Sequence, residues 1–144
     1  MEAGVLISDH DGRVLLVEPV YKEHWEIPGG PVETDESPYA AAVRELSEEL
    51  GISVVPGRLL VVDWVPPQAG RTEGVMFVYD GAVLDQALEA DIRLPEDELR
   101  SWAWSTAAEA EARLSAPLAR CVQAAQRAAH ERVTTYLEDG HQVA

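Results

Sequence analysis

Six carboxylates gather between Glu33 and Glu49, in the segment PVETDESPYAAAVRELSEEL, and their spacing indicates metal chemistry. Glu45, Glu48 and Glu49 are close to one helical turn apart, so on a helix they project from one side. Like charges at these spacings destabilise an isolated helix by roughly 0.2–0.5 kcal/mol per pair. A divalent cation would relieve this repulsion, and Mg²⁺ and Mn²⁺ prefer oxygen ligands.

A Pro28-Gly29-Gly30 turn stands just before this acidic segment. Glycine permits backbone conformations and close approaches that other residues cannot adopt, so the turn can aim carbonyl oxygens toward the glutamates. The competing interpretation is an acidic helix face that is merely solvated, which is the commoner meaning of such a pattern. The glycine turn favours the metal site.

The helix that would carry these glutamates is predicted from its ends and from its apolar spacing. Ser37 is a suitable N-cap, Pro38 fits the first helical position, and Gly51 fits the C-terminal stop. This gives a helix of about 13 residues, with the glutamates on the side opposite its apolar residues. Those apolar residues are Val43, Leu46 and Leu50. We therefore expect Glu49 to face solvent and metal rather than the core.

The other elements follow from shorter patterns. Residues 4–9 and 13–19 read as two strands joined by the turn HDG. Strands are also predicted in residues 53–65, 73–84 and 99–105, and a mostly helical segment in 106–137 with a break near 115–117. This order predicts one α/β domain over residues 1–144, with a mixed sheet covered by helices on both sides.

Composition limits the possible partners. The formal charge of −15 on 144 residues would repel a nucleic-acid polymer, since such binding relies on Lys and Arg. No apolar run is long enough to span a membrane, and the start MEAGVLISDHDG lacks the profile of a signal peptide. Cys121 is the only cysteine, which excludes an internal disulfide. We expect a cytoplasmic protein, with a homodimer possible.

The acidic segment resembles the sequence motif of a known family. Gly30, Glu36, Arg44-Glu45-Leu46, Glu48-Glu49 and Gly51-Ile52 stand at the spacing of the Nudix box, and every defining position is filled. The preceding WEIPGG is similar to the usual entry into that box. Asp35 departs from the pattern, because the family often has glycine there. The resemblance implies a Nudix-type α/β/α sandwich.

The resemblance also implies an activity and a site. Nudix enzymes hydrolyse the pyrophosphate of a nucleoside diphosphate linked to another group, with Mg²⁺ or Mn²⁺. By that resemblance Glu45, Glu48 and Glu49 would hold metal or activate water, and Arg44 would orient a glutamate. The Gly29 carbonyl would be a further ligand. Glu36 is either another ligand or an anchor of the loop.

An acidic ligand from outside the box is common in the family. Glu98 is our candidate, because it immediately precedes the predicted strand 99–105. Glu73, Glu96 and Asp97 are weaker candidates, since a loop charge without a catalytic part explains each of them.

The substrate is read less directly from the sequence. Tyr21, Trp64 and Phe77 could stack on a base, and Arg71 could contact phosphate. Core packing and surface solubility are the alternatives for these residues, and Tyr79, Arg13, Lys22 and Arg58 are similar cases. The preferred substrate is a nucleoside triphosphate or a modified nucleotide.

Two other functions remain open. One is an ADP-ribose or nucleotide-sugar pyrophosphatase, which Pro67 supports through its place 15 residues after the box. The other is a non-catalytic Nudix-fold domain that binds nucleotides or regulates a partner. Such domains usually lose box glutamates, whereas this chain keeps all of them.

Overall fold

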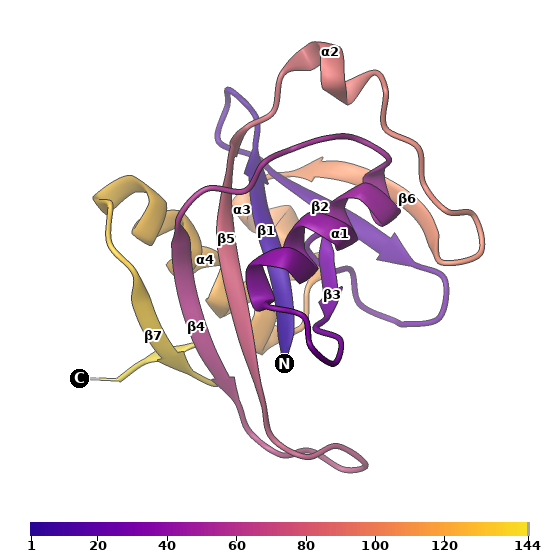
Figure 1. The fold of residues 1–144 in the computed structure, drawn as a ribbon. Helices are drawn as coiled ribbons and strands as arrows, with labels where there is room; N and C mark the ends of the chain where they lie inside the picture. The colour runs from indigo at the N-terminus through magenta and orange to yellow at the C-terminus, as the bar shows by residue number, and fades with distance from the viewer. Residues whose placement is uncertain (144) are drawn as a thin grey trace.

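The computed structural model describes residues 1–143, and its centre is one mixed β-sheet (Figure 1). The strands follow the order β6-β2-β1-β5-β4-β7-β8, and β3 pairs with β1. Parallel pairing joins β1 to β5 and β4 to β7. The bounds are β1 Glu2–Ser8, β2 Val14–Pro19, β3 Gly29–Pro31, β4 Leu59–Val65, β5 Gly74–Val83, β6 Leu99–Ser105, β7 Thr135–Glu138 and β8 His141–Gln142.

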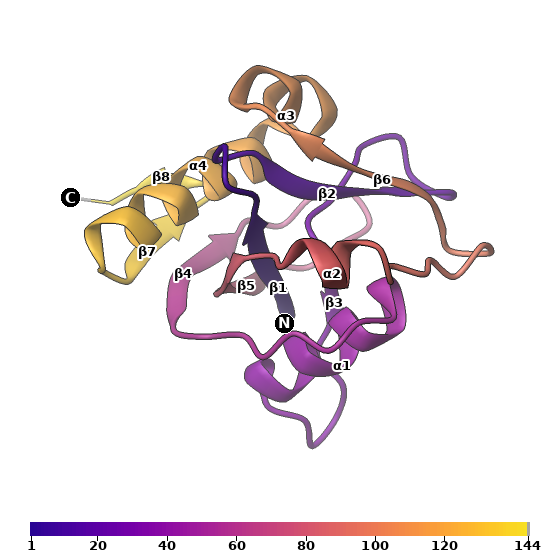
Figure 2. The same ribbon diagram turned by 90° about the horizontal axis from the view of Figure 1, so that it is seen from above.

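Helices cover both faces of this sheet, as predicted. Figure 2 shows the sheet between α1 and α2 on one side and α3 and α4 on the other. The helices are α1 Pro38–Leu50, α2 Gln86–Glu89, α3 Ala107–Arg113 and α4 Ala116–Glu131. The α/β fold class and the α/β/α sandwich are thereby confirmed. None of the helices in residues 1–143 is long and apolar enough to cross a membrane.

Each face of the sheet has its own hydrophobic core. Along β1, Val5 and Ile7 pack with α1, whereas Leu6 packs with α4. This alternation follows from the two-residue repeat of a strand, and it requires β1 to be apolar on both faces. β1 therefore lies at the centre of the molecule and fixes the position of the elements beside it.

The α1 helix has the predicted ends but a different buried face. Ser37 accepts a hydrogen bond from the Ala40 N–H at 3.1 Å, and Gly51 ends the helix with φ of 65°. Val43 was expected in the core, yet its exposed fraction is 41%. The helix instead buries a side that contains small residues and two glutamates, namely Ala41, Ala42, Glu45, Leu46, Glu49 and Leu50.

The prediction of helix through residue 137 is wrong at its end. The predicted break near Ser115 is confirmed, because α3 ends before it and α4 begins after it. α4 stops at Glu131, and Arg132 adopts the left-handed conformation with φ of 59°. β7 follows and pairs with β4, since its β-branched and aromatic residues suit a strand. The helical pattern upstream carries no information about this pairing.

The strand predictions are correct in type and less so in extent. β1 and β2 form the expected antiparallel pair, with Gly12 at φ of 80° in the turn between them. The strand predicted over residues 53–65 begins only at Leu59. The segment before it contains Pro56, which has no N–H to donate to a sheet.

Candidate active site

An open cavity of about 1360 Å³ lies where the Nudix-type segment meets the edge of the sheet. Its walls come from β3, from α1, from the β2–β3 and β4–β5 connections, and from the start of α4. Four of the predicted site glutamates line it, and they are Glu45, Glu48, Glu49 and Glu98. Folding therefore brings Glu98 to the helix glutamates across a large distance in the sequence.

Glu49 is buried, which differs from the expectation that it faces solvent. Its exposed fraction is 7%, and its Oε1 accepts a hydrogen bond from the Gly29 N–H at 2.6 Å. Burial raises its pKa from 4.5 to about 8, and the nearby charges of Glu45, Glu26 and Glu98 act in the same direction. The ionised form of Glu49 is therefore unfavourable in free energy unless a cation lies beside it, and without a cation the protonated form is favoured.

Glu45 lies beside Glu49 on the same face of α1 and is almost as buried, with an exposed fraction of 9%. A Cβ added to Gly30 would lie 2.6 Å from the Glu45 carboxyl carbon. Glycine at this position therefore lets the carboxylate approach the backbone of β3. Burial raises the pKa of Glu45, while its ion pair with Arg44 opposes that shift.

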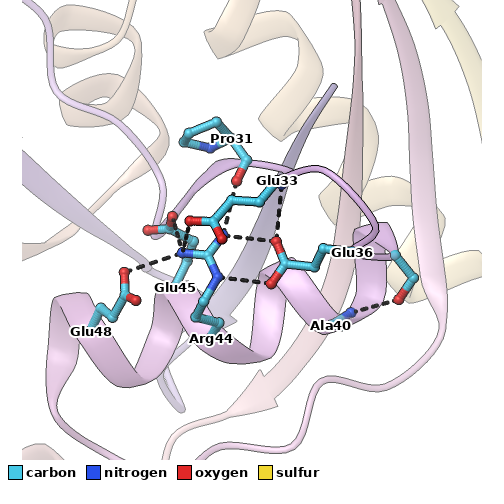
Figure 3. Close-up of polar contacts among 8 residues, drawn as sticks. Pro31, Glu33, Glu36, Ala40, Arg44, Glu45 and Glu48 are labelled. Carbon is cyan, nitrogen blue, oxygen red and sulfur yellow. Dashed lines mark hydrogen bonds and ion pairs between the residues drawn. The ribbon is translucent and has the colours of Figure 1, made fainter.

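Arg44 holds the acidic groups of the loop and the helix together (Figure 3). Its guanidinium bonds Glu36 at 2.8 and 2.9 Å, and one nitrogen also contacts Glu45 at 2.9 Å and Glu48 at 3.2 Å. The Pro31 carbonyl accepts a further bond at 3.0 Å. A planar guanidinium with five N–H donors can satisfy this many acceptors, whereas lysine cannot.

Glu36 was predicted to be either a metal ligand or an anchor of the loop, and its contacts favour the anchor. Hydrogen bonds from Arg44 lower the pKa of Glu36 to about 2, and the Glu33 N–H contributes to the shift. Glu36 is absent from the cavity wall, so it supports the site through Arg44. Asp35 in the same loop has φ of 64°, which explains why glycine suits this position.

Two of the predicted substrate contacts lie at the cavity and two do not. Tyr21 and Arg71 line it, together with Lys22 and His24. Trp64 and Phe77 were also predicted to contact substrate, but neither is among the residues that line the cavity. Side chains alternate along a strand, and these two point away from the cavity-lining Asp63 and Met76.

Arg58 and Arg13 also have structural partners in place of a phosphate. Arg58 donates to the carbonyls of Ala128 and Val133, each at 2.6 Å. Arg13 donates to the Asp9 carboxylate at 2.7 Å. Neither residue lines the cavity, and these contacts favour a structural role for both.

Asp63 is a cavity residue that the sequence analysis missed. It lies on β4 between Val61 and Val65, and its exposed fraction is 4%. Alternation along the strand could have revealed it, because a carboxylate stands at a position of the buried face. A buried carboxylate of this kind is uncommon and marks a position for a specific partner.

The glutamates do not form a ready-made cation site. Within residues 1–143, no three acidic, histidine or cysteine side chains converge tightly enough to hold a metal ion. Arg44 and the Gly29 N–H hold the glutamate oxygens instead. The donor set nevertheless fits a hard cation, because Glu45, Glu48, Glu49 and Glu98 line one cavity and carboxylate oxygens are suitable ligands.

Comparison with known proteins agrees with this geometry. The profile of the NUDIX domain matches residues 1–132. The chain belongs to the NUDIX family. The diphosphoinositol polyphosphate phosphohydrolase 3-alpha of Mus musculus is 46% identical to it over 56 residues, which are 38% of this chain and 34% of that protein. The RNA pyrophosphohydrolase of Halorhodospira halophila is 41% identical over 49 residues, 34% of this chain and 27% of that protein.

The fold has close structural counterparts as well. The crystal structure of a MutT protein from Methanosarcina mazei Go1 aligns with a TM-score of 0.71 at 25% identity, covering 91% of this chain and 93% of that chain. By contrast, this chain spans only about a third of the length of the curated relatives that it matches. The similarity in sequence is therefore concentrated in one part of the NUDIX domain.

Proposed function

We propose that this protein hydrolyses the pyrophosphate bond of a nucleoside diphosphate derivative with the help of Mg²⁺ or Mn²⁺. The substrate we favour is a nucleoside triphosphate or a modified nucleotide. The observation that carries the proposal is that Glu45, Glu48, Glu49 and Glu98 line one cavity. The family assignment and the pyrophosphohydrolase activity named for a relative support it.

Oxygen atoms of this chain would hold the cation. The donors are the carboxylates of Glu45, Glu48, Glu49 and Glu98, and the Gly29 carbonyl as a further ligand. When bound, such a cation screens phosphate charge and lowers the pKa of water. Arg44 would keep Glu45 and Glu48 in place, so that their mutual repulsion does not turn them away from the substrate.

Glu49 is the group best suited to accept the proton of the attacking water. Without a bound cation, burial raises its pKa to about 8, close to the neutral range where a general base works most efficiently. Its Oε1 is fixed by the Gly29 N–H, which leaves its other oxygen for the reaction. The buried environment also limits competition from bulk water.

The charge of the cavity limits the number of phosphates on the substrate. Nine carboxylates line it, against the three cationic side chains of Lys22, Arg44 and Arg71. Arg44 is already bonded to carboxylates, and Lys22 bonds Glu26 at 2.6 Å. This supports a substrate with a short phosphate chain over a ring that carries many phosphates. ADP-ribose and nucleotide sugars satisfy the same condition and form the second candidate class.

The test is a substrate panel with Mg²⁺ present or removed by a chelator. Nucleoside triphosphates, oxidised nucleotides, ADP-ribose, nucleotide sugars and dinucleoside polyphosphates are incubated with the protein, and the products are identified by chromatography. We expect cleavage within the phosphate chain that stops when the metal is removed. Absence of turnover with every compound would refute the enzymatic proposal and favour a binding role.

A further inference from the structure

The half of the cavity away from the Nudix-type glutamates has one buried carboxylate, Asp63 of β4. In-register pairing connects it to the rest of the site through the row Pro31–Glu2–Met76–Asp63 across β3, β1, β5 and β4. Residues paired in this way point to the same face of a sheet. At about 4.8 Å per strand spacing, Asp63 is roughly 14 Å from β3. This separation suits a nucleotide whose phosphates lie at β3 and whose base lies at Asp63.

The Asp63 carboxylate keeps acceptor capacity that the protein does not use. Oδ1 accepts the Gly140 N–H at 3.0 Å, and the Cys121 thiol is its other hydrogen-bonding neighbour. Among the described residues, no cationic nitrogen forms an ion pair with it. Arg120 instead donates to the backbone carbonyl of Asp139 at 2.7 Å and lies 3.5 Å from the Asp139 carboxylate. A carboxylate has about four acceptor sites, so two remain for a ligand.

The surroundings of Asp63 suit a flat ring. Apolar side chains line this part of the cavity, from the two strands and from the start of α4. They are Val65, Met76 and Leu118, with Pro66 and Pro117. Bases held outside a duplex are read through hydrogen bonds to their Watson–Crick edge and through stacking on apolar side chains. Asp63 has acceptor oxygens of the kind that the first requires, and the apolar wall has the surface that the second requires.

We propose that Asp63 determines base specificity, and that it accepts hydrogen bonds from N1–H and the 2-amino group of guanine. This proposal rests on the proposed function and narrows its substrate class to guanosine phosphates. Guanine presents two adjacent N–H donors, which match the two oxygens of a carboxylate. Uracil presents one N–H between two carbonyl oxygens, which a carboxylate would repel. Adenine presents one amino group beside an acceptor nitrogen.

The first experiment compares guanosine triphosphate with inosine triphosphate on the wild-type protein, since these differ only in the 2-amino group. We expect kcat/KM to be at least about ten-fold higher for guanosine, because inosine leaves part of a buried carboxylate unpaired. Equal values for the two substrates would overturn the proposal. Uridine triphosphate should be a poorer substrate than either.

The second experiment uses Asp63→Asn, whose amide oxygen can still accept the Gly140 N–H. We expect the preference for guanosine over inosine to fall to about one, while uridine triphosphate turnover rises, because the neutral amide no longer repels the uracil carbonyls. Asp139→Asn is the matched control, since Asp139 is nearby but does not line the cavity, and it should keep the wild-type preference. An equal loss with all three bases would show that Asp63 is only structural.

A binding measurement keeps this proposal separate from the proposed function and from any folding defect. Guanosine and inosine monophosphate are titrated into the wild-type protein by calorimetry, which needs no turnover. Tighter binding of the guanosine compound without hydrolysis would retain the base site and refute the enzymatic proposal. Hydrolysis without a preference in either assay would retain the enzymatic proposal and refute the role of Asp63.

Discussion

At the scale of single residues, the burial of Glu49 has two separable consequences. One concerns the reaction, because the group is a proposed proton acceptor in the cavity. The other concerns stability, because a carboxylate with a pKa raised from 4.5 to about 8 holds its proton more tightly folded than unfolded. The contribution of this group to the free energy of unfolding is therefore largest below about pH 4.5, and it is lost as the pH rises through about 8.

Glu49→Gln tests both consequences. We expect kcat to fall by about 10²-fold or more, since an amide cannot accept the proton. We also expect the variant to match the wild type in thermal stability near pH 5 and to exceed it near pH 9, measured without metal by calorimetry. The exposed Glu111→Gln is the control and should leave activity and pH dependence unchanged. A stability difference independent of pH would contradict the assigned burial effect.

Asp35 gives a second prediction at this scale. Its left-handed backbone with φ of 64° is unfavourable for a residue that has a Cβ. Asp35→Gly should raise the free energy of unfolding by up to about 1 kcal/mol in urea titrations, the gain being reduced by the greater entropy of the unfolded chain. Asp35→Ala keeps the Cβ and should be destabilising. If both variants were equally stable, backbone strain would not explain this position.

At the scale of secondary-structure elements, Arg58 joins the start of β4 to the end of α4. Its guanidinium donates to the carbonyls of Ala128, Ala129 and Val133. The last carbonyls of a helix have no partner within the helix, so this side chain supplies their hydrogen bonds. The contact also places β7, which follows the helix and pairs with β4.

Arg58→Ala should therefore destabilise the fold without altering catalysis directly. We expect a loss of about 1–3 kcal/mol in the free energy of unfolding, from chemical denaturation. Arg127→Ala is the comparison, because Arg127 is exposed on the same helix and should change stability by less than about 0.5 kcal/mol. Similar losses for the two variants would show that the charge, and not the capping contact, is responsible.

At the scale of the whole molecule, the formal charge of −15 opposes the compact state. Sodium chloride should raise the melting temperature by screening this repulsion. Mg²⁺ at the same ionic strength should raise the melting temperature further. At a hundred-fold excess of Mg²⁺ over its Kd, the expected gain in the free energy of unfolding is about 2.7 kcal/mol. In Glu49→Gln the additional effect of Mg²⁺ should shrink while the effect of sodium chloride stays. Identical effects of the two salts on the wild type would argue against a specific cation site.

The sequence by itself determined the local framework of the site. The N-cap Ser37 and the stop at Gly51 depend on neighbours in the chain, and the structure has both as predicted. The turn predicted at Gly29-Gly30 is wrong, because these residues form β3 and pair with β1. The break at Ser115 follows from the same kind of signal. The spacing of Arg44 with the helix glutamates is also local, so the family pattern could be read directly. Turn and cap preferences act over a few residues, which is why sequence alone contains them.

Only the tertiary structure decided which side chains meet in the cavity. Glu49 is buried and Val43 exposed because α1 presents its small residues to the sheet. Asp63 lines the cavity and Trp64 does not, because the pairing of β4 with β5 sets the face to which each side chain points. Register between strands and the rotation of a helix on a sheet depend on contacts among distant residues. Local periodicity does not encode these contacts, and so the partner of Asp63 could be proposed only from the folded chain.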